Sequence, residues 1–170
     1  MNKLLILDIS GVLCCKLDNS ITIKLPIIMQ TQYYKVVSRP YVDEFFAYVF
    51  ENYNIAFFSS TAYHNAKPIL DYFLSPKQQK RCVFLWFRDR THFDPDSNGH
   101  DTIKKLSDVI DNPIINSNKK YTYDNTMICD DSSNKMRFNP AKNVIICEEF
   151  CGDVDDDYLL RLMSKLKDEF

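Results

Sequence analysis

The sequence has little glycine and no long apolar run. Its 170 residues include only three glycines, Gly11, Gly99 and Gly152, which excludes glycine-rich phosphate loops of the GxGxxG and GxxxxGK types. The apolar run that starts at Leu4 ends at Asp8, whereas a membrane-spanning helix needs about 20 apolar residues and a signal-peptide core about 7–15. We therefore expect neither a targeting segment nor an association with a membrane.

The chain also lacks an excess of positive charge. Lys and Arg number 21 against 23 Asp and Glu, which leaves a formal net charge of −2 at pH 7. Because proteins that bind nucleic acid carry basic patches, we expect no nucleic-acid partner. Hydrophobic residues make up 45% of the chain, enough to form the core of one domain of this length. We expect residues 1–170 to form that single domain and the protein to be a monomer.

Six cysteines are present, but their spacing is not that of a zinc site or a disulfide framework. No two of them are spaced as CxxC, and none stands at zinc-finger spacing from a histidine. Cys82, Cys129 and Cys147 lie in apolar runs, where a free thiol behaves as a small buried hydrophobe. We therefore expect a reducing compartment, either the cytoplasm or the nucleus.

Short apolar runs alternate with helix-like segments along the chain. Continuous apolar runs predict parallel strands buried on both faces, at residues 4–7, 55–58, 82–87, 126–129 and 144–147. Helical spacing predicts helices at residues 41–53, 65–74, 102–110 and 154–170. In the last helix, three aspartates (155, 156 and 157) fall in the first turn, and the expected apolar stripe is Leu159, Leu160, Met163 and Leu166. The alternation indicates an α/β fold with a parallel sheet and helices on both faces.

One segment interrupts this alternation. Between residues 14 and 38, two strand-like stretches at 20–24 and 33–37 stand on either side of Pro26, which predicts a β-hairpin insertion after the first strand. We expect this hairpin to form a small flap and expect no large cap. Polar stretches at 88–99 and 112–125 predict loops.

Polar side chains stand where the predicted strands end. They are Asp8, Ser10, Ser59, Ser60, Asp130 and Asp131. Ligands of an open parallel sheet bind beyond the carboxyl ends of its strands, so we expect these side chains to meet, together with Lys104 near the start of the helix at 102–110. A carboxylate nucleophile, hydroxyl groups, a fixed cation and a carboxylate pair are the groups that Mg²⁺-dependent phosphoryl transfer requires.

These residues lie in motifs that resemble the haloacid dehalogenase (HAD) superfamily. The resemblance is closest to its FCP/SCP-like branch, the phosphatases of the RNA polymerase II C-terminal domain and the NLI-interacting-factor-like proteins. In chain order, DISGVL at 8–13 resembles the branch's DLDETL, RPYVDEF at 39–45 resembles RPxVDEF, AKPILD at 66–71 resembles ADPVLD, TIKKLS at 102–107 resembles YVKDLS, and DDS at 130–132 resembles DNS. The resemblance covers nearly the whole chain and implies a Rossmann-like HAD fold.

The resemblance also implies roles for the matching residues. Asp8 is implied as the nucleophile that forms an aspartyl-phosphate, and Ser59 and Lys104 as the groups that bind the phosphoryl oxygens. Ser60 is a second candidate for phosphate binding, and Ser60 or Thr61 takes the place of Ser59 if the register is shifted.

A Mg²⁺ site is implied by the same motifs. Its ligands are the carboxylates of Asp8 and Asp130 and the backbone carbonyl of Ser10, with Asp131 orienting a metal-bound water. The implied substrate is a phosphorylated protein or peptide. Hydrolytic dehalogenation, another reaction of the superfamily, needs no metal, so the pair Asp130 and Asp131 favours the phosphatase.

Ser10 departs from the family pattern, which places an aspartate general acid/base at this position. Serine cannot donate a proton as a carboxylic acid does, and such help is worth typically about 10²–10⁴-fold. Alkyl phosphates such as phosphoserine have the more basic leaving group, so the substitution favours aryl phosphates such as phosphotyrosine. It also favours an alternative function, an inactive pseudophosphatase that serves as a binding or scaffold module.

Two further alternatives concern residues outside the motifs. His64 is either a substitute acid or a surface residue at the start of a helix. Six other side chains either line a peptide groove or pack in the core and on the hairpin: Tyr33, Tyr34, Trp86, Phe87, His92 and Phe93.

Overall fold

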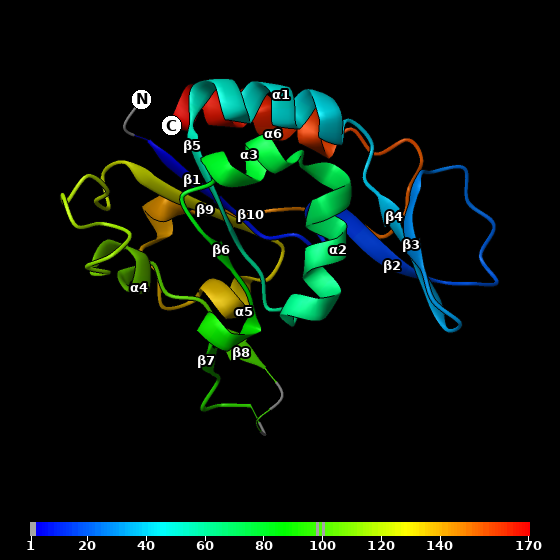
Figure 1. Ribbon diagram of the computed structural model, residues 1–170, viewed down its shortest axis with the longest axis horizontal. Coiled ribbons are helices and arrows are strands. Elements are labelled where there is room, and N and C mark those ends of the chain that lie inside the picture. The colour runs from blue at the N-terminus through cyan, green and yellow to red at the C-terminus, as the bar shows by residue number, and fades with distance from the viewer. Residues whose placement is uncertain (1–2, 98, 100) are drawn as a thin grey trace.

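A five-stranded parallel sheet lies at the centre of the computed structural model, which describes residues 3–97, 99 and 101–170 (Figure 1). Residue 98, part of the loop predicted at 88–99, lies outside these ranges. The strand order is β10-β9-β1-β5-β6, with β1 at Leu4–Leu7, β5 at Asn54–Phe58, β6 at Leu85–Trp86, β9 at Thr126–Asp130 and β10 at Val144–Ile146. The predicted α/β fold with a parallel sheet is confirmed, although β6 is shorter than the run at 82–87.

Helices cover both faces of this sheet. They are α1 (Val42–Asn52), α2 (Tyr63–Phe73), α3 (Pro76–Arg81), α4 (Ser107–Ile110), α5 (Ser133–Met136) and α6 (Tyr158–Glu169). Leu5 and Leu7 of β1 belong to an apolar cluster with α1, α2 and α6, whereas Leu4 and Ile6 belong to a second cluster with residues of α4 and α5. Because successive strand residues point to opposite faces, burial of both faces explains why the strands read as continuous apolar runs. Figure 1 shows α1 and α6 packed together on one face.

The insertion at 14–38 is a three-stranded antiparallel sheet rather than a two-stranded hairpin. Its order is β2-β4-β3, with β2 at Cys14–Asp18, β3 at Ile27–Gln30 and β4 at Tyr34–Ser38. The strand predicted at 20–24 is therefore wrong. Asp18 accepts hydrogen bonds from the backbone N–H and the hydroxyl of Ser20, and this local turn ends β2. The Lys35 ammonium then holds the following stretch by donating to the Ile21 carbonyl.

The helix predicted at 102–110 is also wrong in its first half. Thr102–Ile103 forms β8, which pairs antiparallel with β7 (His92–Phe93), and α4 begins only at Ser107. Lys104 therefore follows a short strand and does not lie in a helix. The predicted loop at 88–99 contains the 3₁₀ helix η1 (Arg88–Arg90) as well as β7. A second 3₁₀ helix, η2, spans Ala141–Asn143.

The C-terminal helix starts later than predicted. It begins at Tyr158 and Asp157 is its N-cap, so Asp155 and Asp156 precede the helix instead of lying in its first turn. Its fully buried residues include Leu159, Leu162 and Leu166, whereas Leu160 is 37% exposed. Within the described part of the chain, no helix combines the length and the apolar character needed to cross a bilayer.

Candidate active site

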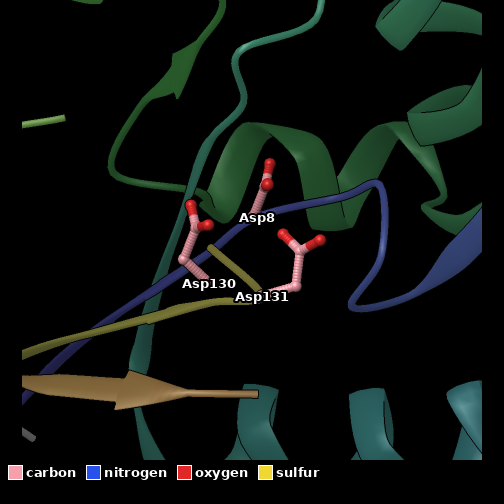
Figure 2. A group of neighbouring side chains, drawn as sticks. All are labelled: Asp8, Asp130 and Asp131. Atoms are coloured by element: carbon pink, nitrogen blue, oxygen red, sulfur yellow. The ribbon is translucent and has the colours of Figure 1, made fainter. Parts of the chain in front are cut away.

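Three strands of the parallel sheet bring polar side chains to one edge. Asp8 follows β1, Asp130 ends β9 and Ser59 follows β5. In the strand register, Leu7 lies beside Cys129 on one side and Phe57 on the other, so the residues that follow emerge at nearly the same level. Figure 2 shows the carboxylates of Asp8, Asp130 and Asp131 gathered at this edge.

Lys104 lies between two of these carboxylates. Its Nζ is 2.6 Å from Asp130 Oδ2 and 3.1 Å from Asp8 Oδ1, and its side chain is fully buried. The backbone of Lys104 is fixed because its N–H donates to the Lys135 carbonyl and its carbonyl accepts from Asn139 Nδ2. Both the side chain and the backbone of Lys104 are thus fixed at the site.

Burial and neighbouring charges shift the pKa values of Asp8 and Lys104 in opposite directions. Burial raises the pKa of Asp8 above its usual 3.8, and Lys104 counteracts part of that rise. For Lys104, burial alone lowers the pKa, but Asp8 and Asp130 outweigh it and raise the pKa above 10.5. Lys104 therefore stays an ammonium group at neutral pH, which provides a fixed positive charge for an anionic ligand.

The aspartates have more negative charge than Lys104 neutralises. Asp8, Asp130 and Asp131 each offer an oxygen, and these atoms lie within 4.8 Å of one another. Among the described residues, Asp131 Oδ1 is buried and has no hydrogen-bond partner. Burial, followed by the neighbouring Asp8, raises the pKa of Asp131. An oxygen-only donor set with an unpartnered carboxylate oxygen fits a hard divalent cation such as Mg²⁺.

Gly11 is required by the position of Asp131. Its φ is +81°, and a Cβ at this position would lie 2.2 Å from Asp131 Oδ2. Only glycine avoids this contact and adopts this φ without strain. Ser10 and Gly11 line a hollow of about 540 Å³ together with Thr61, Asp131 and Lys135, and β2 of the inserted sheet borders it.

The hydroxyl groups after β5 differ in their contacts. Ser59 is 1% exposed, its N–H donates to the Trp86 carbonyl, and its Oγ accepts from the Thr61 N–H at 3.2 Å. Ser60 Oγ is 3.0 Å from Thr102 Oγ1, which donates to it. The Ser60 hydroxyl is therefore tied to β8, and Thr61 is the residue of this turn that lines the hollow.

Arg39 has a structural role that its motif alone does not reveal. Its guanidinium is bidentate to Asp156, with both N–O distances 2.7 Å. It also donates to the carbonyls of Val12 and Glu148 at 3.1 and 2.9 Å. These bonds join the turn after Asp8 to the segments that precede α6. The guanidinium also packs on the rings of Phe150 and Tyr158, 5.2 and 4.6 Å from their centroids.

Lys135 is a second cation at the site that the sequence reasoning missed. It lines the hollow with Asp131, and its charge opposes the rise that burial causes in the pKa of Asp8 and of Asp131. The signal was its position only four residues after Asp131, in the short helix α5 that follows the motif.

The alternatives outside the motifs are partly resolved. His64 is exposed and lies at the start of α2, and the described lining of the hollow does not include it, which favours a surface role. Trp86 and Phe87 are buried in the two apolar clusters, whereas Tyr33 and Phe93 are 73% and 75% exposed. The six side chains therefore do not share one environment.

Comparisons with known sequences find a family model and a relative. The family model described as NLI interacting factor-like phosphatase matches residues 3–170. An uncharacterized FCP1 homology domain-containing protein of Schizosaccharomyces pombe is 24% identical over 155 residues, which is 86% of this chain and 61% of that protein.

Solved structures show the same fold. Fcp1, an essential RNA polymerase II CTD phosphatase, matches 98% of this chain and 47% of its own with a TM-score of 0.58 and 14% identity. A fission yeast Fcp1 variant bound to beryllium fluoride matches 96% of this chain and 49% of its own, with a TM-score of 0.58 and 13% identity. The chain thus spans about half the length of these solved relatives. On the match over residues 3–170, the chain belongs to the NLI interacting factor-like phosphatase family.

Proposed function

We propose that this domain is a Mg²⁺-dependent phosphatase of phosphorylated protein side chains that works through an aspartyl-phosphate on Asp8. The observation that carries the proposal is the buried contact of the Lys104 ammonium with both Asp8 and Asp130. An anionic nucleophile approaches a phosphate dianion only where fixed positive charge neutralises it, and this contact supplies such charge at the nucleophile.

The residues of the site divide the chemistry between them. An Asp8 oxygen attacks phosphorus, the bond to the leaving oxygen breaks, and water later hydrolyses the aspartyl-phosphate. Lys104 and Ser59 bind the phosphoryl oxygens. Mg²⁺ would be held by Asp8, Asp130 and the Ser10 carbonyl, with Asp131 as an outer partner. When bound, it supplies further positive charge to the phosphoryl group.

The serine at position 10 leads us to predict which substrates are preferred. Without an aspartate at this position, phosphotyrosine and other aryl phosphates are better substrates than phosphoserine, because a phenolate leaves more readily than an alkoxide. The comparison of kcat/KM on phosphotyrosine and phosphoserine peptides tests this preference, and equal values contradict it. Ser10→Asp is expected to raise turnover of the phosphoserine peptide.

The decisive experiment measures hydrolysis of an aryl phosphate by the purified chain with and without Mg²⁺. Asp8→Asn is expected to lower metal-dependent turnover by at least about 10³-fold, as loss of a nucleophile does. Asp43→Asn, at an exposed position at the start of α1, is the matched control and is expected to keep full activity. Absence of turnover in the wild type contradicts the proposal and favours the binding module, the function that Ser10 also supports.

The setting of the enzyme is part of the same proposal. All six cysteine thiols are free, as in proteins of a reducing compartment, which supports the cytoplasm or the nucleus. The domain is expected to act as a monomer on a phosphorylated protein.

A further inference from the structure

The hollow beside Ser10 contains a carboxylate that no motif identifies. Asp131 and Glu149 are the two carboxylates among the described residues that line it. Asp131 belongs to the cluster that fits a cation. Glu149 lies outside that cluster and is exposed to solvent, so it is free to contact a leaving group in the hollow.

The backbone holds Glu149 close to the nucleophile loop. The N–H of Phe150 donates to the Gly11 carbonyl at 2.8 Å, and the N–H of Cys147 donates to the Asp130 carbonyl at 2.8 Å. Glu149 lies between these two bonds. One of them joins its segment to the turn after Asp8, and the other joins it to the end of β9.

The carboxylates of Glu148 and Glu149 differ in their partners. The Glu148 carboxylate pairs with Arg161 at 2.7 Å, on the side of α6. Among the described residues, the Glu149 carboxylate has no hydrogen bond or ion pair that would hold it away from the hollow. Its charge acts on Asp131, where it adds to the rise in pKa that burial and Asp8 cause.

We propose that Glu149 supplies, from the segment that follows β10, part of the proton transfer that Ser10 cannot perform. This inference rests on the proposed phosphatase function. In the first step the Asp8 oxygen bonds to phosphorus, the bond to the leaving oxygen breaks, and the Glu149 carboxyl group delivers a proton to that oxygen, which leaves as the alcohol. In the second step Glu149 takes a proton from water as the water oxygen bonds to phosphorus and the bond between phosphorus and the Asp8 oxygen breaks. This releases inorganic phosphate, the Asp8 carboxylate and the protonated Glu149.

Glu149 comes from a different chain segment than position 10, where the family has its aspartate. It therefore compensates only in part for the missing aspartate, and the preference for aryl phosphates remains.

The test uses two esters that differ in their need for a proton. With Mg²⁺ present, Glu149→Gln is expected to lower kcat/KM on a phosphoserine peptide by about 10–100-fold and on 4-nitrophenyl phosphate by less than about threefold, since general acid catalysis matters most for a basic leaving group. Glu148→Gln is the matched control and is expected to change neither value. Ser10→Asp in the Glu149→Gln protein is expected to restore hydrolysis of the phosphoserine peptide.

The outcomes separate this inference from the function on which it rests. Equal losses on both esters, or no loss on either, overturn the role of Glu149 while the phosphatase function stands. A wild-type protein without metal-dependent turnover on any ester overturns both. Thermal unfolding of each variant shows whether a loss comes from the fold, which would affect both esters alike.

Discussion

Arg39 and Lys104 are both fully buried cations, yet their surroundings differ. Arg39 has a bidentate carboxylate, backbone carbonyls and two aromatic rings around it. Lys104 has two carboxylates and the Phe58 ring around it, with Asp131 and its unpartnered oxygen close by. The first region is satisfied by the protein itself, whereas the second retains negative charge for a ligand.

This difference shows that the Arg39 region stabilises the fold, whereas the Lys104 region is suited to bind a ligand. Buried polar groups that are all paired fix one conformation. Groups left unpaired are costly to the folded state and mark sites where a ligand completes the pairing. The turn that follows Asp8 belongs to both regions, because Arg39 binds its carbonyls and any Cβ at Gly11 would collide with Asp131.

Removal of Lys104 is expected to have the largest effect. Lys104→Met leaves Asp8 and Asp130 buried without a counter-charge, a change that costs about 3–5 kcal/mol in the free energy of unfolding. Phosphatase activity is expected to be lost as well. Lys105→Met is the control, since Lys105 is only half-buried and lies over the Phe138 ring. Urea unfolding measures both variants, and equal stability losses contradict the special position of Lys104.

Arg39→Met is expected to cost about 2–4 kcal/mol, because it leaves Asp156 and backbone carbonyls without their donor. Arg161→Met, which removes an exposed arginine paired with Glu148 and Asp157, is expected to cost less than about 1 kcal/mol. If the two variants unfold at the same urea concentration, Arg39 has no such structural role.

The Arg39 pair also gives stability a pH dependence. Burial raises the pKa of Asp156, but the hydrogen bond and charge of Arg39 outweigh it and leave the pKa below 3.8. A carboxyl group with a lowered pKa stabilises the fold above its ordinary pKa, and this stabilisation is lost as the pH falls through the lowered value. Unfolding measured from neutral to acid pH is therefore expected to show a smaller acid loss in Arg39→Met.

Gly11→Ala tests the turn that both regions share. The positive φ and the contact with Asp131 are expected to cost about 1–3 kcal/mol together, and displacement of Asp131 is expected to weaken Mg²⁺ binding. Gly99→Ala is a close control, because Gly99 has the same φ of +81° but its added Cβ meets no described atom within 4 Å. If Gly99→Ala loses as much stability as Gly11→Ala, the cost comes from φ alone and not from the contact with Asp131.

Asp131→Asn is expected to have the smallest effect and the opposite sign. Burial and Asp8 raise the pKa of Asp131 above 3.8, so its ionised form destabilises the metal-free fold at neutral pH and this penalty disappears below the ordinary pKa. The variant is expected to gain about 0.5–1 kcal/mol at neutral pH in EDTA and to bind Mg²⁺ more weakly. A loss of stability under these conditions contradicts this account of the cluster.

The sequence predicted the residues that follow strands, because continuous apolar runs locate buried strands and the next polar residue then lies at the sheet edge. This reasoning was sufficient for Asp8, Ser59 and Asp130. It was wrong for the local setting of Lys104, since pairing of Thr102–Ile103 with β7 depends on a strand ten residues earlier. It also did not separate Ser59 from Ser60, because the Thr102 contact that distinguishes them is a tertiary one.

Other parts of the site have no local signal at all. Arg39 and Asp156 are 117 residues apart in the chain, and only the packed fold shows that they pair. Glu149 reaches the hollow because backbone bonds to Gly11 and Asp130 place its segment there. Spacing and periodicity describe single elements, whereas these contacts form between elements.

The two ends of the inserted three-stranded sheet are fastened side by side. The N–H of Arg39 donates to the Leu13 carbonyl at 2.9 Å, and Ser38 pairs with Cys14 in the β2–β4 ladder. A segment that leaves and re-enters a domain at one point can change in length or sequence without redirecting the rest of the chain. The part of the insertion beyond its core residues Cys14, Val36 and Val37 can therefore change while the nucleophile and its buried cation stay where they are.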